Sequence, residues 1–214
     1  MYRSLLFSLL AVLTFAPAAS STTIVLSELS SDATPAILLD ATVDFDVVGT
    51  ILTVTVFNQT TLPDEYEIVE LFFNSSDDVT GLTLDLAGTK TCPAIQCKWD
   101  LFAGSGMTGQ TVADGFGFYD WALKSNSNPG KIVAGETFVF EFTIAGVGPF
   151  DMSDFATDLS QAPQGDTPAL VAAKFVTGPG DDSAFGATVP EPGTFAMLGL
   201  GILGLDVIAR RRDR

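Results

Sequence analysis

The sequence predicts an all-β fold, a two-sheet antiparallel sandwich that lies between an N-terminal signal helix and a C-terminal transmembrane helix. Apolar and polar residues alternate with a period of two in several internal segments, and residues that form turns separate those segments. No internal segment has a sustained helical period. With 214 residues, of which 47% are apolar, the chain is large enough to bury one core.

The composition excludes several classes of function. The chain has 26 acidic residues, 10 basic residues and no histidine. Without histidine there is no Ser-His-Asp or Cys-His machinery and no imidazole ligand for a metal. A net charge of -16 repels phosphate backbones, so we expect no nucleic-acid partner.

Residues 1–20 have the organisation of a secretory signal peptide. Arg3 supplies the positive charge, and an apolar segment, 4–16, follows it. Ala16-Pro17-Ala18 then provides small residues at a cleavage site. We expect cleavage after Ala18, with Ser20 as the second choice, and therefore export by the general secretion machinery. The alternative is a buried hydrophobic helix.

The strand pattern defines a β-sandwich domain over residues 21–177. It is clearest in Ile51–Phe57 and in Thr137–Ile144, where every second residue is apolar. In the second segment Phe138, Phe140 and Phe142 share one face. Residues 178–188, rich in glycine and aspartate, are predicted to form a linker. The other expected strands are Thr23–Leu29, Ile37–Val48, Tyr66–Asn74, Gly81–Ala87, Lys98–Ala103, Phe116–Lys124 and Leu170–Thr177.

The segment Ile132–Phe140 resembles the turn and strand of many immunoglobulin-like and cohesin-like modules of bacterial surface proteins. This resemblance implies the sandwich architecture that the alternation of residues also predicts.

The C-terminal segment, 189–214, has three parts. Pro190-Glu191-Pro192 favours an extended backbone, since each proline fixes its φ angle and lacks a donor. An apolar segment, 193–209, is long enough for a short transmembrane helix. The basic tail, 210–214, contains Arg210, Arg211 and Arg212, which we expect to stay in the cytoplasm and to stop translocation.

This tail resembles the PEP-CTERM sorting signal of Gram-negative bacteria. The positions that match are Pro190, Glu191 and Pro192, the glycine-rich span, and the arginine cluster. The resemblance implies export across the inner membrane, transient anchoring there, and cutting near the motif by an integral-membrane exosortase. The body would then reach the cell surface or the extracellular matrix. The alternative is a single-pass anchor that is never cut.

Cys92 and Cys97 suit a disulfide in an oxidising compartment. A ring this short would add about 2 kcal/mol of stability on the loop-entropy model. A redox pair needs the spacing C-x-x-C, and two thiols alone rarely form a structural zinc site. We therefore expect a structural staple.

The acidic residues offer one candidate metal site. Asp151, Asp154 and Asp158 lie close together in the sequence and could supply oxygen ligands to calcium, the one cofactor considered. They do not follow the EF-hand pattern. Because acids are so frequent in this chain, a solvated acidic surface is the stronger interpretation.

Tyr119 and Trp121 form a candidate sugar platform, since alternation places them on one face of a strand. Asp120 between them could accept hydrogen bonds from sugar hydroxyls. The alternative, which is favoured, is that this face belongs to the core and that Trp121 caps it.

These observations predict an exported surface protein with a structural or adhesive role, and not an enzyme. The family resemblance adds an association with exopolysaccharide, because such sorting systems accompany its production. A carbohydrate-binding module is the alternative. A glycan hydrolase is a remote third, because the spacing of the acids selects no catalytic pair.

Overall fold

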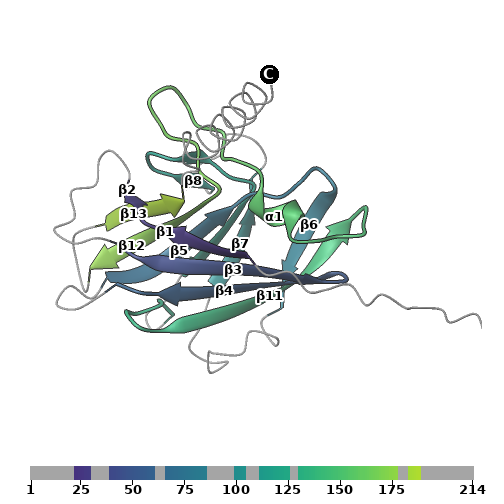
Figure 1. The fold of residues 1–214 in the computed structure, drawn as a ribbon, viewed down its shortest axis with the longest axis horizontal. Coiled ribbons are helices and arrows are strands. Elements are labelled where there is room, and N and C mark those ends of the chain that lie inside the picture. Colours follow the sequence, from purple (N-terminus) through teal and green to yellow (C-terminus); the bar gives the residue numbers. More distant parts are fainter. Residues whose placement is uncertain are drawn as a thin grey trace, which may run out of the picture.

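The computed structural model confirms an all-β fold made of two antiparallel sheets (Figure 1). It describes residues 22–29, 39–60, 66–85, 99–104, 111–125, 130–177 and 183–188. The predicted signal peptide, Cys92, Cys97, the Pro-Glu-Pro motif, the transmembrane helix and the basic tail lie outside these ranges.

Five strands form the first sheet, called sheet A, in the order β1-β3-β4-β11-β6. Six strands form sheet B, in the order β2-β13-β12-β5-β10-β7. The strands of sheet A are β1 (Thr22–Leu26), β3 (Ala41–Val48), β4 (Ile51–Asn58), β6 (Val79–Leu84) and β11 (Thr137–Gly146). Those of sheet B are β2 (Glu28–Leu29), β5 (Tyr66–Phe73), β7 (Trp99–Ala103), β10 (Trp121–Ser125), β12 (Val171–Thr177) and β13 (Ser183–Thr188).

Three short elements complete the described fold. The strands β8 (Val112–Ala113) and β9 (Gly117–Phe118) pair with each other in a small separate sheet. The single described helix, α1 (Ser153–Ala156), follows β11 and lies near the upper end of the sandwich in Figure 1.

The apolar residues that alternate in the sequence are the ones that are buried in the strands. In β11, Phe138, Phe140, Phe142 and Ile144 are buried, whereas the residues between them are partly or fully exposed. The neighbouring strand β4 turns Leu52, Val54 and Val56 inward in the same way. Because successive side chains of a strand point to opposite faces, both strands place one apolar face against sheet B.

Aromatic rings join the two sheets. Phe73 of β5 lies 5.6 Å from Phe45 of β3 and 6.3 Å from Phe142 of β11, both in edge-on geometry. Trp99 of β7 makes a similar contact with Phe140, at 5.1 Å. Edge-to-face pairs add stability beyond the area that they bury, so these contacts fix how the sheets sit on each other.

Sheet B is also buried on the face that points away from sheet A. Phe72 lies in a row with Ala122, Ala172 and Ala187 of the neighbouring strands. These small residues leave room for Phe116 and Tyr119, which cover them in a second apolar cluster. Burial on both faces explains why β5 ends in three consecutive buried apolar residues, Leu71, Phe72 and Phe73.

The predicted linker 178–188 needs correction, because residues 183–188 form β13. This strand pairs with β12 on one side and with β2 on the other, so it lies inside sheet B. Its last residue, Thr188, donates a side-chain hydrogen bond to the carbonyl oxygen of Val25 in β1. The folded body therefore extends to residue 188, and the N-terminal strands hold its final strand.

We predict that Phe142→Ala lowers the free energy of unfolding by about 3–5 kcal/mol, since it leaves a cavity between the sheets. Phe57→Ala is the matched control: Phe57 is half-buried on the outer face of β4, so its loss should cost much less. Denaturant unfolding followed by tryptophan fluorescence measures both. Equal losses in the two variants would contradict the description of the core.

Candidate functional site

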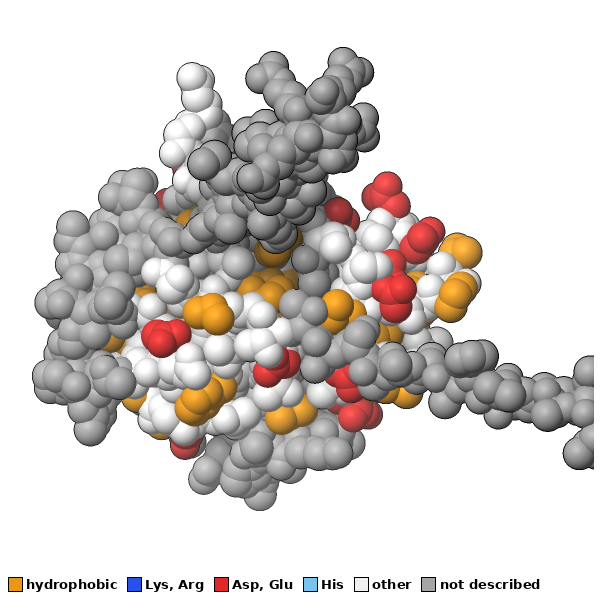
Figure 2. All heavy atoms as spheres, in the orientation of Figure 1, with side chains coloured by type: hydrophobic (Ala, Val, Ile, Leu, Met, Phe, Trp, Pro, Cys, Tyr) orange, Lys and Arg blue, Asp and Glu red, His pale blue; other side chains and the backbone are white. Residues whose placement is uncertain are grey.

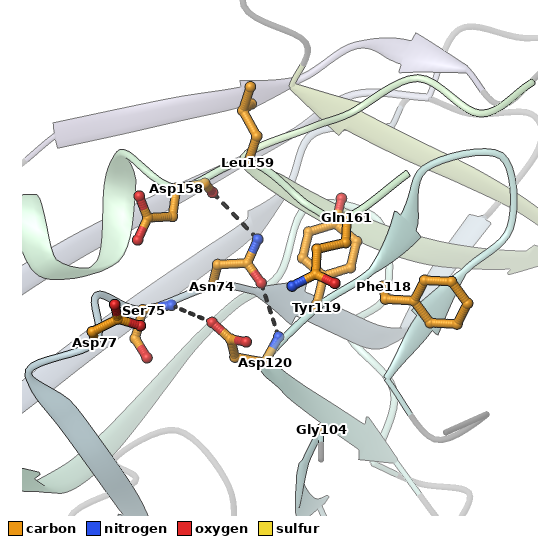
Figure 3. A pocket seen from close by; sticks show the side chains of 10 residues that line it. All are labelled: Asn74, Ser75, Asp77, Gly104, Phe118, Tyr119, Asp120, Asp158, Leu159 and Gln161. Carbon is orange, nitrogen blue, oxygen red and sulfur yellow. Dashed lines mark hydrogen bonds between the residues drawn. The ribbon is translucent and has the colours of Figure 1, made fainter. Parts of the chain in front are cut away.

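A pocket of about 270 Å³ lies at the end of sheet B where β5 stops and β10 starts (Figure 3). Four segments that are distant in sequence build it: the turn after β5, Gly104 directly after β7, the residues of β9 and of its junction with β10, and the chain that follows α1. The residues that line the pocket are Asn74, Ser75, Asp77, Gly104, Phe118, Tyr119, Asp120, Asp158, Leu159 and Gln161.

The buried side chain of Asn74 joins three of these segments: the turn after β5, the junction of β9 and β10, and the chain that follows α1. Its Oδ1 accepts a hydrogen bond from the backbone N–H of Asp120 at 2.8 Å, and its Nδ2 donates to the carbonyl oxygen of Asp158 at 3.3 Å. Both bonds are drawn in Figure 3. Because Asn74 directly follows the inward-facing Phe73, the core fixes where this amide lies.

Asp120 interrupts the single strand that the sequence predicts over Phe116–Lys124. The chain forms β9, breaks at Tyr119 and Asp120, and resumes as β10. The Asp120 carboxylate accepts the N–H of Ser75 at 3.1 Å, and its backbone carbonyl accepts the N–H of Gly104 at 2.6 Å. The break therefore directs a carboxylate towards the turn after β5.

Ser75 and Ser76 attach this turn to its surroundings. The Ser75 hydroxyl accepts a hydrogen bond from the Trp121 indole at 2.9 Å. Ser76 donates through its hydroxyl to the carboxylate of Asp154 at 2.6 Å and through its backbone N–H to the carbonyl of Asp154 at 2.8 Å. The turn, which forms one wall of the pocket, is thus hydrogen-bonded both to a core residue and to α1.

Gly104 allows close approach of two backbones. A Cβ atom at this position would lie 2.4 Å from the carbonyl oxygen of Tyr119 and 2.6 Å from the hydroxyl of Thr111. Any larger residue would therefore push the β9–β10 junction away and change the pocket.

The pocket is polar and negatively charged. Three carboxylates line it, those of Asp77, Asp120 and Asp158, and none of the lysines that the structure describes does. The lysines of the described ranges, Lys124, Lys131 and Lys174, lie within 4 Å of Glu70 or Glu67 on β5. Figure 2 shows the same imbalance on one face, where acidic side chains gather beside α1 and no blue side chain is visible.

The structure does not bring Tyr119 and Trp121 together on one exposed face. Tyr119 is 3% exposed and packs on Phe72, with ring centroids 5.8 Å apart, in the outer cluster. Trp121 is 7% exposed and belongs to the core between the sheets. Because the strand is broken at Asp120, Tyr119 and Trp121 do not lie on the same face, and they form no exposed platform. Tyr119 nevertheless contributes to the wall of the pocket.

Two of the three aspartates proposed for calcium have carboxylates that accept hydrogen bonds from other groups. Asp151 accepts hydrogen bonds from the N–H and hydroxyl of Ser153, which lower the pKa of its carboxyl group. Asp154 accepts from Ser76 and from the backbone N–H of Asp151, while Asp158 lines the pocket. Within the described ranges no three acidic side chains come close enough to hold a metal ion. Calcium binding therefore stays a prediction without support from this geometry.

Most residues of the pocket have no signal in the sequence that marks them as a site. The pattern indicates Asn74 only as the last residue of an expected strand and Asp158 only as a calcium ligand. Nothing in the spacing of Asn74, Asp120 and Gln161 indicates that they meet, because their proximity depends on how β5, β10 and the segment after α1 are arranged.

The end of β13 gives the body its connection to the C-terminal tail. In the sequence, an apolar segment and a basic tail follow this strand directly. A family model for the PEP-CTERM protein-sorting motif matches residues 188–212, so this chain carries a PEP-CTERM sorting motif. The motif implies export, transient membrane anchoring and processing by an exosortase, a membrane enzyme.

Other comparisons give no further relative. Neither the curated proteins nor the solved structures contain a significant match to the chain. In the part of the chain that the structure describes, no helix is long and apolar enough to cross a membrane. The predicted span 193–209 lies outside that part.

We predict that Tyr119→Phe keeps the stability at pH 7 within about 1 kcal/mol of the original, since the Tyr119 hydroxyl has no hydrogen-bond partner among the described residues. The nearby Ser160 hydroxyl is already engaged with Phe116 and Ala169.

The same variant should lose less stability in alkali. Burial raises the pKa of Tyr119 above its ordinary value of 10.0. The unfolded chain therefore ionises this phenol first, and its stabilisation, complete below about pH 10, is lost as the pH rises further. Urea unfolding at pH 7 and pH 11 tests this; an unchanged alkaline loss in Tyr119→Phe would contradict it.

Proposed function

We propose that this protein is an exported, exosortase-sorted β-sandwich with a structural or adhesive, non-catalytic role in the exopolysaccharide layer of the cell surface. The observation that carries the proposal is the sorting motif, whose matched residues begin at Thr188, the last residue of β13. The β-sandwich is therefore the part of the protein that the sorting motif would deliver. Two antiparallel sheets packed around one apolar, aromatic-rich core suit a mechanically stable component of an extracellular matrix.

The pocket favours a second candidate function, carbohydrate binding. Its carboxylates and amides can accept and donate hydrogen bonds, and aromatic rings form part of its wall. Binding a polysaccharide would be one way for a surface protein to adhere, so the two functions are compatible.

Processing should remove both ends of the chain. We expect the intact mass of the surface protein to lack the residues before the signal cleavage site, after Ala18 or Ser20, and to lack Arg214. The variant Pro190→Ala/Glu191→Ala/Pro192→Ala should keep its tail and stay with the membrane fraction. Thr194→Ala, a change in the tail outside the motif, should be processed as usual. An untrimmed chain dissolved in the cytosol would overturn the proposal.

A spacer should speed processing. Only Val189 separates Thr188 from Pro190, and an extended residue spans at most about 3.6 Å, so the cut region lies close to the folded sheet. An enzyme in the membrane must therefore meet the sandwich itself or release the end of β13. We expect an insertion of eight Gly and Ser residues after Thr188 to raise the rate of tail removal in pulse-chase experiments. The same insertion after Gly165, in an exposed turn, serves as the control.

A further inference from the structure

Among the described residues, acceptors and amides line the pocket and no positively charged side chain does. Asp77, Asp120 and Asp158 contribute carboxylates, and Asn74 and Gln161 contribute amides. The net charge of the chain, -16, and these carboxylates repel anions. Phosphate, sulfate and acidic sugars are therefore unsuitable ligands.

A desolvated metal ion is also unsuitable. Calcium takes six to eight oxygen ligands that converge on one point. In the described ranges the acids do not form such a group, and one oxygen of Asp120 is already held by the N–H of Ser75. Separated acceptors of this kind match a ligand that donates several hydrogen bonds in different directions, as the hydroxyl groups of a neutral sugar do.

The pocket also has apolar surface. Four large apolar residues of the described ranges are exposed, and of these Leu159, which is 46% exposed, lines the pocket. In Figure 3 it lies above the polar group, and Phe118, which is half-buried, lies to the right of it. Sugar rings have apolar C–H faces that pack on such side chains.

One wall contains an unused polar group. Tyr119 is almost fully buried and lines the pocket, yet its hydroxyl has no hydrogen-bond partner among the described residues. Buried polar groups are normally satisfied, so this hydroxyl has capacity for a further hydrogen bond.

We propose that this pocket binds a neutral sugar residue, through hydrogen bonds to Asp77, Asp120 and Asp158 and apolar contact with Leu159. The inference rests on the proposed surface role and names the ligand class for it. At about 270 Å³ the pocket holds a short stretch of glycan rather than a long one.

Tryptophan fluorescence can report the binding, because the indole of Trp121 is bonded to Ser75 in the pocket wall. The full-length protein, in a detergent without a sugar head group, is titrated with glucose, galactose and mannose. A second arm uses dextran, galactomannan and the polysaccharide of the producing cells. We expect a saturable change, confirmed by calorimetry. A response to monosaccharides identifies free sugars as ligands, and a response to polymers alone identifies a glycan chain; both support the sugar site.

Two variants locate the site. Asp120→Asn and Leu159→Ser should each weaken binding about tenfold, the loss expected for one hydrogen bond or apolar contact. Two control variants should stay within about twofold of the original: Asp78→Asn, a charge change outside the pocket in the turn after β5, and Val48→Ser, a change of an exposed apolar residue outside the pocket. Leu159 is exposed, so its variant tests the site even where Asp120→Asn unfolds the protein.

The proposal is overturned when no sugar in either arm gives a saturable signal, or when the controls weaken binding as much as the pocket variants do. Calcium chloride that raises the melting temperature while all sugars fail would instead identify a cation site. Tail removal, read from the intact mass, is measured separately. A protein that has lost its tail but binds no sugar would contradict this inference without contradicting the sorting function.

Discussion

The contact of Phe73 with Phe45 and Phe142 is the interaction on which the rest of the structure depends. It joins sheet B to two strands of sheet A through edge-on aromatic pairs in a fully buried layer. Phe73 is also the last residue of β5, so packing of its ring sets the position of Asn74, the residue that holds the pocket together. The site is therefore an extension of the core rather than an independent loop structure.

Two buried asparagines fix β5 at its opposite ends. Asn58, at the end of β4, donates to the carbonyl oxygens of Tyr66 and Ile132 and accepts two hydrogen bonds from Thr60. Asn74 has the corresponding role at the far end. A buried amide that lost its partners would cost about 1–3 kcal/mol, so each asparagine strongly disfavours other arrangements of the chain around it. Apolar packing holds the two sheets together, and the hydrogen bonds of these two amides fix the chain segments at the ends of β5.

The sequence predicted the parts of the fold in which one face of a strand is buried and the other is not. Phe138, Phe140 and Phe142 alternate with polar or smaller residues, and the pairing of β11 with β4 follows that alternation. It did not predict β13, because the Ser183–Thr188 segment consists mainly of small residues that are buried on both faces and has no clear period. The pocket was not predictable for another reason: Asn74, Asp120 and Asp158 meet only through tertiary contacts, and the break at Asp120 moves Tyr119 away from Trp121.

The register of sheet B places the pocket and the departure of the tail at one end. Trp121, Phe73, Val171 and Thr188 form a continuous row across β10, β5, β12 and β13. Two interstrand steps, about 10 Å, separate β5 from β13. Under the proposed function, a tail anchored in the bilayer would keep this end of sheet B near the membrane, and cutting near the motif would free it. Capture of the proposed ligand would then follow maturation without any change in the bonds of the sandwich.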